Sequence, residues 1–167
     1  DYDVQNKLVA IHDSYTGGTV GFAGDASSVS QAACAGLVGS VQAINANNQY
    51  QIRTSYSIAD VSCLNTASEV SAAGLIGSIY ESQDVTEHIM LADNFAAGEV
   101  RAANMERARG LYTSYAKNGN SQLPGYIDFG SNAFDQSATQ VTNITPENQC
   151  GENFGLGESI TQCQVVN

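Results

Sequence analysis

The spacing of apolar residues is the feature of this chain that most restricts its fold. Between residues 84 and 115, apolar side chains recur at steps of three and four, at Val85, Ile89, Ala92, Ala96, Val100 and Ala103. Such steps place side chains on one face of an α-helix, which has 3.6 residues per turn. The same stripe continues to Tyr115, so the spacing predicts one long helix, or two that are divided at Gly98 or Gly110.

Shorter stripes with the same spacing predict further helices at residues 4–15, 29–44 and 70–80. Residues 52–64 are ambiguous, because their apolar residues fit both the alternation of a strand and the period of a helix. The neighbouring stripes favour a helix here. Gly36 and Gly39 interrupt the second stripe, and we expect another backbone to pack closely against them.

The composition changes after Pro124, where Gly, Asn and Ser become frequent and no helical period is sustained beyond a short helix near residues 134–141. We recognise no internal repeat. We therefore expect one all-α domain, a disulfide-tied helical bundle of four to five helices. Residues 1–122 would form the bundle core, and residues 123–167 a loop-rich tail that wraps it.

Cysteine usage indicates the compartment. The chain has four cysteines and no CxxC motif, and it has six Lys and Arg residues in total. An even cysteine count without zinc or thioredoxin spacing favours an extracellular protein with disulfides, as does the glycosylation acceptor Asn143-Ile144-Thr145. Three pairings are open, and we favour the two bonds that close the shortest loops, Cys34–Cys63 and Cys150–Cys163.

Charge restricts the partners. The formal net charge is −11 at neutral pH, which repels nucleic-acid phosphates and anionic lipid headgroups. No stretch approaches the roughly 18 apolar residues that a membrane-spanning helix needs. The acidic composition therefore predicts a protein with neither a nucleic-acid partner nor a membrane span.

The two histidines do not predict a catalytic or metal site. His88 follows Glu87 in the strongest helical stripe, but neighbouring residues point to different sides of a helix. His12 stands beside Ile11 in the first stripe, and neither histidine belongs to an HExxH motif. GxSxG and phosphate-loop motifs are missing as well. We expect no catalytic residues, no metal and no cofactor.

A bundle without a catalytic motif predicts a secreted, non-catalytic binding protein that carries a small apolar ligand between its helices. The expected lining, taken from the stripes, is Leu37, Val41, Ile76, Ile89 and Phe95. The alternative is an extracellular structural or self-assembling protein of a matrix, coat or secretion, which forms homo-oligomers. An enzyme that uses scattered carboxylates is the third hypothesis.

Overall fold

The chain forms parallel β-sheets, and the expected all-α bundle is wrong. The computed structural model describes residues 8–22, 31–43, 49–65, 69–81, 89–113, 115–117, 127–128, 131–141, 150–153, 158–160 and 163–167. Within these ranges there are twenty strands, one α-helix of four residues, α1 (Gln136–Thr139), and one 3-10 helix, η1 (Met105–Arg107).

The strands follow one another in three complete coils and a partial fourth. The first coil contains β1 (Leu8–His12), β2 (Tyr15–Thr16), β3 (Thr19–Phe22), β4 (Gln31–Ala35) and β5 (Val41–Ala43). The second contains β6 (Gln49–Arg53), β7 (Tyr56–Ser57), β8 (Asp60–Cys63), β9 (Glu69–Ala73) and β10 (Ile79–Glu81). The third contains β11 (Ile89–Ala92), β12 (Phe95–Ala96), β13 (Val100–Ala102), β14 (Ala108–Arg109) and β15 (Tyr115–Lys117). The remaining strands are β16 (Ile127–Asp128), β17 (Ala133–Asp135), β18 (Gly151–Asn153), β19 (Glu158–Ile160) and β20 (Gln164–Val166).

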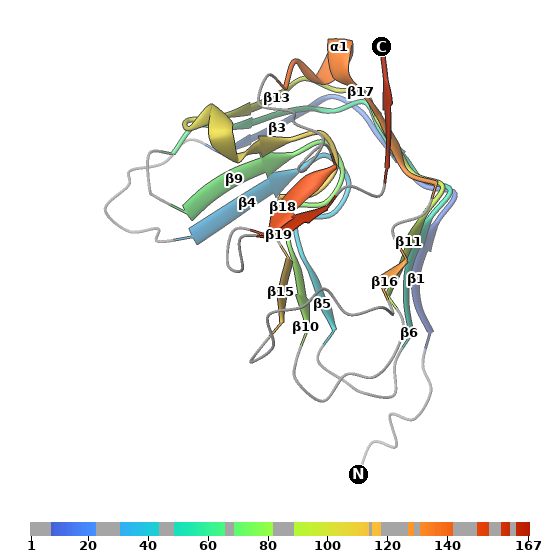
Figure 1. Cartoon of the computed structure of the whole chain (residues 1–167). Helices are drawn as coiled ribbons and strands as arrows, with labels where there is room; N and C mark the ends of the chain where they lie inside the picture. The colour runs from blue at the N-terminus through green and yellow to red at the C-terminus, as the bar shows by residue number, and fades with distance from the viewer. Residues whose placement is uncertain are drawn as a thin grey trace.

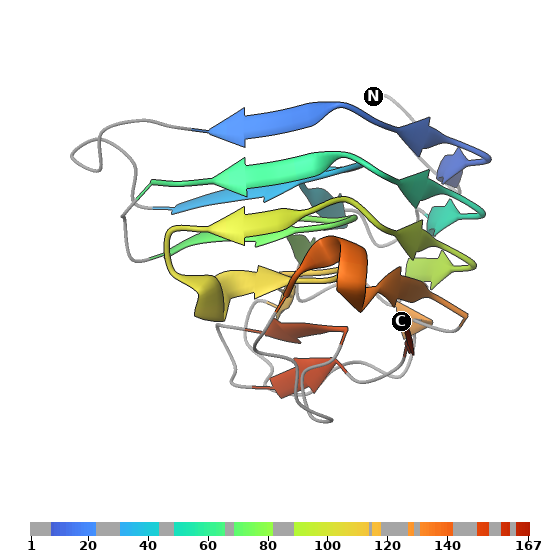
Figure 2. The same cartoon turned by 90° about the horizontal axis from the view of Figure 1, so that it is seen from above.

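The strands of the first three coils pair in parallel with the equivalent strands of the neighbouring coils, so the chain is a β-solenoid. The sheet orders are β1-β6-β11-β16, β2-β7-β12-β17-β20, β3-β8-β13, β4-β9-β14 and β5-β10-β15. Figure 1 looks along the stack, and Figure 2 shows the coils lying one above another from the N-terminal to the C-terminal end. Neighbouring coils are therefore about 4.8 Å apart, the spacing of hydrogen-bonded strands.

The coils are an internal repeat that the sequence analysis missed. The letters "HDSY", "RTSY", "ADNF" and "GSNA" end at Tyr15, Tyr56, Phe95 and Ala133, which lie side by side in one sheet. A second set, "GLVGSV", "GLIGSI" and "GLYTSY", begins at Gly36, Gly74 and Gly110. The coils share residue types at a few corner positions and little else, so the repeat is weak at the level of the sequence.

The helical spacing predicted at residues 89–103 combines residues from both faces of the strands. Ile89 and Leu91 point into the core from β11, two residues apart, as in any strand. The chain then turns a corner at Asp93 and Asn94, where Asn94 is buried, and Ala96 on β12 is the next buried apolar residue. Ala92 is only partly buried and Ala103 is exposed, so the apparent helical stripe joined inward residues to residues that face outward. At residues 52–64 the strand alternative was correct, because β6, β7 and β8 cover most of this range.

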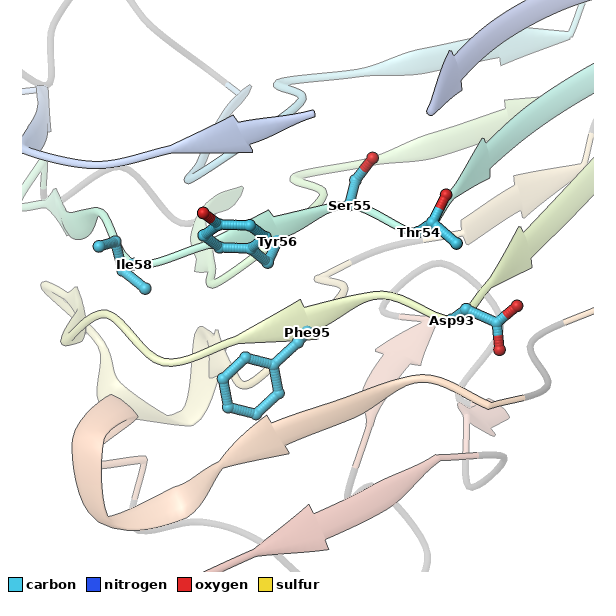
Figure 3. A pocket seen from close by; sticks show the side chains of 6 residues that line it. All are labelled: Thr54, Ser55, Tyr56, Ile58, Asp93 and Phe95. Carbon is cyan, nitrogen blue, oxygen red and sulfur yellow. The ribbon is translucent and has the colours of Figure 1, made fainter. Parts of the chain in front are cut away.

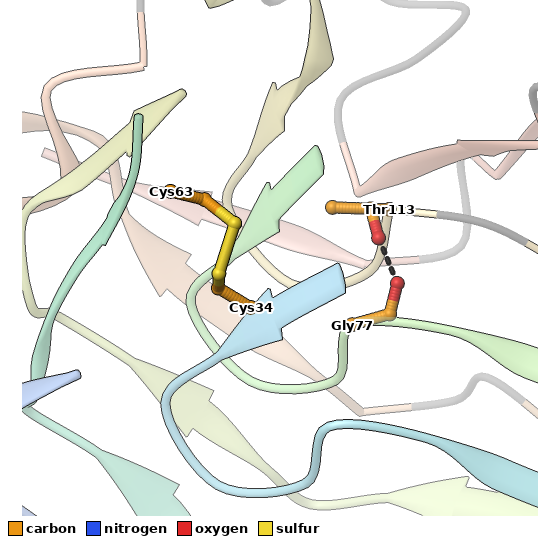
Figure 4. Close-up of a disulfide and its surroundings, with 4 residues drawn as sticks. All are labelled: Cys34, Cys63, Gly77 and Thr113. Carbon is orange, nitrogen blue, oxygen red and sulfur yellow. Dashed lines mark hydrogen bonds between the residues drawn. A yellow bond between two sulfur atoms is a disulfide. The ribbon is translucent and has the colours of Figure 1, made fainter. Parts of the chain in front are cut away.

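Two groups of apolar side chains fill the interior. One lies inside the sheets of β6 and β11 and the corner at residues 74–76, and the other lies between the sheets of β8 and β9. Cys34 of the first coil and Cys63 of the second form a disulfide in this second group (Figure 4). This bond ties one coil to the next from inside. Nearby, the Thr113 hydroxyl donates to the Gly77 carbonyl and links the second and third coils (Figure 4).

Residues 123–167 were expected to form an irregular tail, but their described part extends the solenoid. β16 and β17 add to the first two sheets, and β20 pairs with β17. The carbonyl of Cys150 accepts hydrogen bonds from the amides of Leu111 and Tyr112. The structure contains the Cys150–Cys163 disulfide, which fastens this end and completes the pairing with the shortest loops.

Glycine is required where coils approach most closely. A methyl group at Gly74 would collide with the carbonyl oxygen of Gly110 and with the Ala96 side chain. A methyl group at Gly36 would likewise collide with the Gly74 carbonyl oxygen, so the close backbone approach expected at Gly36 is observed. At Gly39, where the same close approach was expected, a methyl group would meet no atom within 4 Å.

These contacts make Gly74→Ala and Gly39→Ala a matched pair. We expect Gly74→Ala to lower the free energy of unfolding by about 3 kcal/mol or more, because the neighbouring backbone cannot move without separating two coils. Gly39→Ala should change stability by less than about 1 kcal/mol. Urea unfolding monitored by far-UV circular dichroism measures both. Equal effects of the two substitutions would contradict the assigned stacking.

Candidate functional site

The site lies beside a corner that a hydrogen-bond ladder holds in place. The Ser14 amide donates to the Ser55 hydroxyl, the Ser55 amide to the Asn94 side-chain oxygen, and the Asn94 amide to the Asn132 side-chain oxygen. These partners are separated by 41, 39 and 38 residues in the sequence. Asn94 also donates to the Ile52 carbonyl at 2.9 Å. The ladder satisfies buried polar groups and fixes the register of successive coils.

The residue before each ladder position turns the chain. Asp13, Thr54, Asp93 and Ser131 have φ values of 50°, 49°, 58° and 60°, in the left-handed region that few non-glycine residues adopt. All four are exposed. Their equivalent backbone geometry places one polar side chain per coil along the outer side of the corner.

An aromatic row follows directly after the corner. Tyr15 pairs in register with Tyr56, and Tyr56 with Phe95, on strands β2, β7 and β12. The rings of Tyr15 and Tyr56 stack, with centroids 5.4 Å apart and planes 14° from parallel. Tyr15 is 70% exposed and Tyr56 43%. The alternate residues of these strands, Ser57 and Ala96, are buried, so the row occupies the outer face of the sheet.

A hollow of about 540 Å³ lies between the second and third members of this row. Tyr56, Phe95 and Ile58 form its apolar part, and Thr54, Ser55 and Asp93 its polar part (Figure 3). Tyr15 covers one side of the Tyr56 ring, and the hollow borders the rest of it. The hollow is shallow and open to solvent, and Ile58 at its edge is 54% exposed.

Two carboxylates, Asp13 and Asp93, lie along the polar border of the site, and Arg53 lies close enough to Asp13 to interact with it electrostatically. The Thr54 hydroxyl and the His12 ring lower the pKa of Asp13, and the His12 Nδ1 lies 3.0 Å from the Asp13 carboxylate. Asp13 therefore stays ionised from neutral pH down to below the usual range of an aspartate. Carboxylate and hydroxyl oxygens at this border accept hydrogen bonds, and they repel anions.

Thr54 holds an unfavourable backbone conformation at the site. A β-branched residue in the left-handed region is strained, at a cost of about 1–3 kcal/mol. Its side chain lines the hollow and its hydroxyl bonds to Asp13. Strain of this kind concentrates at binding and catalytic positions, where the side chain serves a purpose other than stability.

The predicted ligand lining is divided between the core and this site. Val41, Ile76 and Ile89 are buried in the core, and Leu37 packs against it. Phe95 lies apart from them, on the outer face, where it lines the hollow. The structure therefore does not bring the five residues together around one cavity, because the helices that would have joined them do not exist.

The two histidines and the predicted glycosylation site are the remaining candidate residues. His12 is exposed on β1 and pairs with Asp13. His88 and Asn143 lie outside the described residues. The part of the chain that the structure describes contains no group of three or more His, Cys, Asp or Glu side chains suited to a metal ion. It also contains no helix of the length and apolarity that crossing a bilayer takes.

Sequence reasoning missed Tyr15, Tyr56, Ile58 and the corner residues Thr54 and Asp93. Their signal was the recurrence of a polar pair followed by an aromatic residue in "HDSY", "RTSY" and "ADNF". No family model matches the chain, and no curated protein or solved structure matches it significantly.

Thr54→Asn tests the strain at the site. Asparagine adopts the left-handed region more readily than threonine, so we expect the free energy of unfolding to rise by about 1 kcal/mol. Thr19→Asn, at an exposed threonine of strand β3, is the control and should not stabilise the protein. Urea unfolding measures both variants. A Thr54→Asn protein that is less stable than the control would show that the corner is not strained.

Proposed function

We propose that the protein is an extracellular, non-catalytic binding protein whose ligand is an extended neutral glycan. The observation that carries the proposal is the outer row of Tyr15, Tyr56 and Phe95, one aromatic side chain per coil beside an open hollow. The two disulfides are compatible with an extracellular protein, and they support this setting.

The shape of the site favours a glycan over a small apolar molecule. Sites for small apolar ligands enclose most of the ligand surface, whereas this hollow is open. A pyranose ring has an apolar face of C–H groups and an edge of hydroxyls. The side of the Tyr56 ring that borders the hollow, together with Ile58, matches the apolar face of the sugar. The oxygens of Thr54 and Asp93 match its hydroxyl edge.

The repeat of the coils and the charge of the protein further restrict the class of glycan that would bind. Because the row continues from coil to coil at about 4.8 Å, it suits a linear polymer that lies along the solenoid axis. Asp13 and Asp93 flank the row, on a chain with a net charge of −11. An acidic polysaccharide would be repelled, so the preferred glycan is neutral.

Tyr56→Ala tests the proposal by isothermal titration calorimetry with cellohexaose and a panel of other neutral linear hexasaccharides. We expect the substitution to weaken binding about tenfold, which corresponds to about 1.4 kcal/mol. Leu64→Ala, at a residue that is 52% exposed and lies after β8, is the control and should leave affinity unchanged.

An oligogalacturonate of equal length is the anionic comparison and should bind more weakly than the neutral glycans. Three results would contradict the proposal: no binding of any neutral hexasaccharide to the wild-type protein, tighter binding of the anionic one, or equal losses in the Tyr56 and Leu64 variants. Each variant is first compared with the wild type by far-UV circular dichroism.

A further inference from the structure

The first coil leaves the N-terminal end of the interior partly uncovered. Val9 is in register with Tyr50 and, one coil further, with Ile89. These equivalent inward positions are 50%, 8% and 0% exposed in successive coils. Val20 and Phe22, which lie next to Val61 and Cys63, are also less buried than those partners. The end of the stack therefore presents apolar side chains that the next coil would cover.

Main-chain edges lie at the same end. β1, β3 and β4 each pair with one strand, in the second coil, and are the outermost strands of their sheets. Proteins usually protect such edges with lysine, proline or a bulge. The described strands of the first coil, "LVAIH", "YT", "TVGF", "QAACA" and "VQA", contain neither lysine nor proline.

The opposite end is closed in a different way. β20 lies beyond β17, and the antiparallel pair β18–β19 follows the corner at Cys150. Cys150 is buried, and its carbonyl accepts hydrogen bonds from amides of the third-coil corner. This end therefore differs in strand direction and outline from a coil of the solenoid, and it is a poor match for the first coil of another copy.

The described part of the first coil also carries little charge. In residues 8–22 and 31–43 the one carboxylate is Asp13, which pairs with His12, although the chain as a whole carries −11. These described parts of two first coils can therefore approach each other with little like-charge repulsion, whereas most other pairings of this acidic protein would bring carboxylates together.

We propose that the N-terminal end is a homodimer interface, in which two copies meet first coil to first coil about a two-fold axis. Outermost strands that lie at the axis then pair antiparallel, and Val9, Val20 and Phe22 become buried against the same end of the partner. Because each copy uses its open end, the contact closes at two subunits and does not extend into a fibre.

Sedimentation equilibrium of the 167-residue chain tests the interface, over roughly 1 to 100 µM and at two ionic strengths. We expect a species of twice the 17.5 kDa chain mass. Val9→Lys places a charge at the interface and should raise the dimer dissociation constant at least tenfold. Ile58→Lys adds the same charge at a residue of similar exposure on the outer aromatic face, and should leave the dimer intact.

The wild-type mass alone can overturn the proposal, so the test does not depend on the folding of a variant. A monomer throughout the concentration range would mean that the end stays free or takes a different partner. Oligomers that grow beyond two with concentration would mean head-to-tail stacking. Equal weakening by Val9→Lys and Ile58→Lys would place the contact elsewhere. Loss of the dimer with Val9→Lys alone, with an unchanged circular dichroism spectrum, supports it.

Discussion

The structure depends on the ladder in which Ser14, Ser55, Asn94 and Asn132 connect one coil to the next. A corner of a solenoid turns the backbone out of its sheet and leaves amides without strand partners. Buried amides that lack a partner cost about 1–3 kcal/mol each. A side-chain oxygen from the following coil accepts a hydrogen bond from each of these amides. The same hydrogen bond therefore satisfies the buried amide and sets the register between the two coils. The register of the strands in every sheet follows from the register at this corner.

The ladder also positions the outer face. It fixes the residues immediately before it in the left-handed conformation, and the aromatic row comes directly after it. A one-residue slip at the corner would turn Tyr56 into the core and Ser57 outward. The proposed glycan site is therefore a consequence of the same interaction that aligns the coils, and its repeat distance is the repeat distance of the stack.

Some of this could be predicted from the sequence. The cysteine pairs Cys34–Cys63 and Cys150–Cys163 were favoured by loop length, and the structure contains them. Close backbone approach at Gly36 followed from the cost of glycine inside an element. The fold class could not be read from apolar spacing, because the stripe through Ile89, Ala92 and Ala96 joins two inward residues to Ala92, which alternates to the other face of β11. Hydrophobic spacing is local, whereas the interaction that decides between the two folds joins residues about forty positions apart.

The same reasoning applies to the site. Phe95 was chosen from the sequence for a helical pocket, and the structure places it in an outer hollow with Tyr56 and Ile58. Its neighbours were not predictable, because they belong to the preceding coil and become neighbours through strand pairing alone. A corner motif that recurs in register would have identified them, but it is limited to two or three letters in each coil.

A nuclear Overhauser spectrum of uniformly labelled protein tests the solenoid most directly. The stacked coils predict backbone contacts from Ile52 to both Ile11 and Leu91, its partners in the neighbouring coils. It also predicts contacts from Tyr56 to Tyr15 and Phe95. A series of contacts between residues three apart along 89–103, with none between residues 11, 52 and 91, would show a helix and would contradict the solenoid.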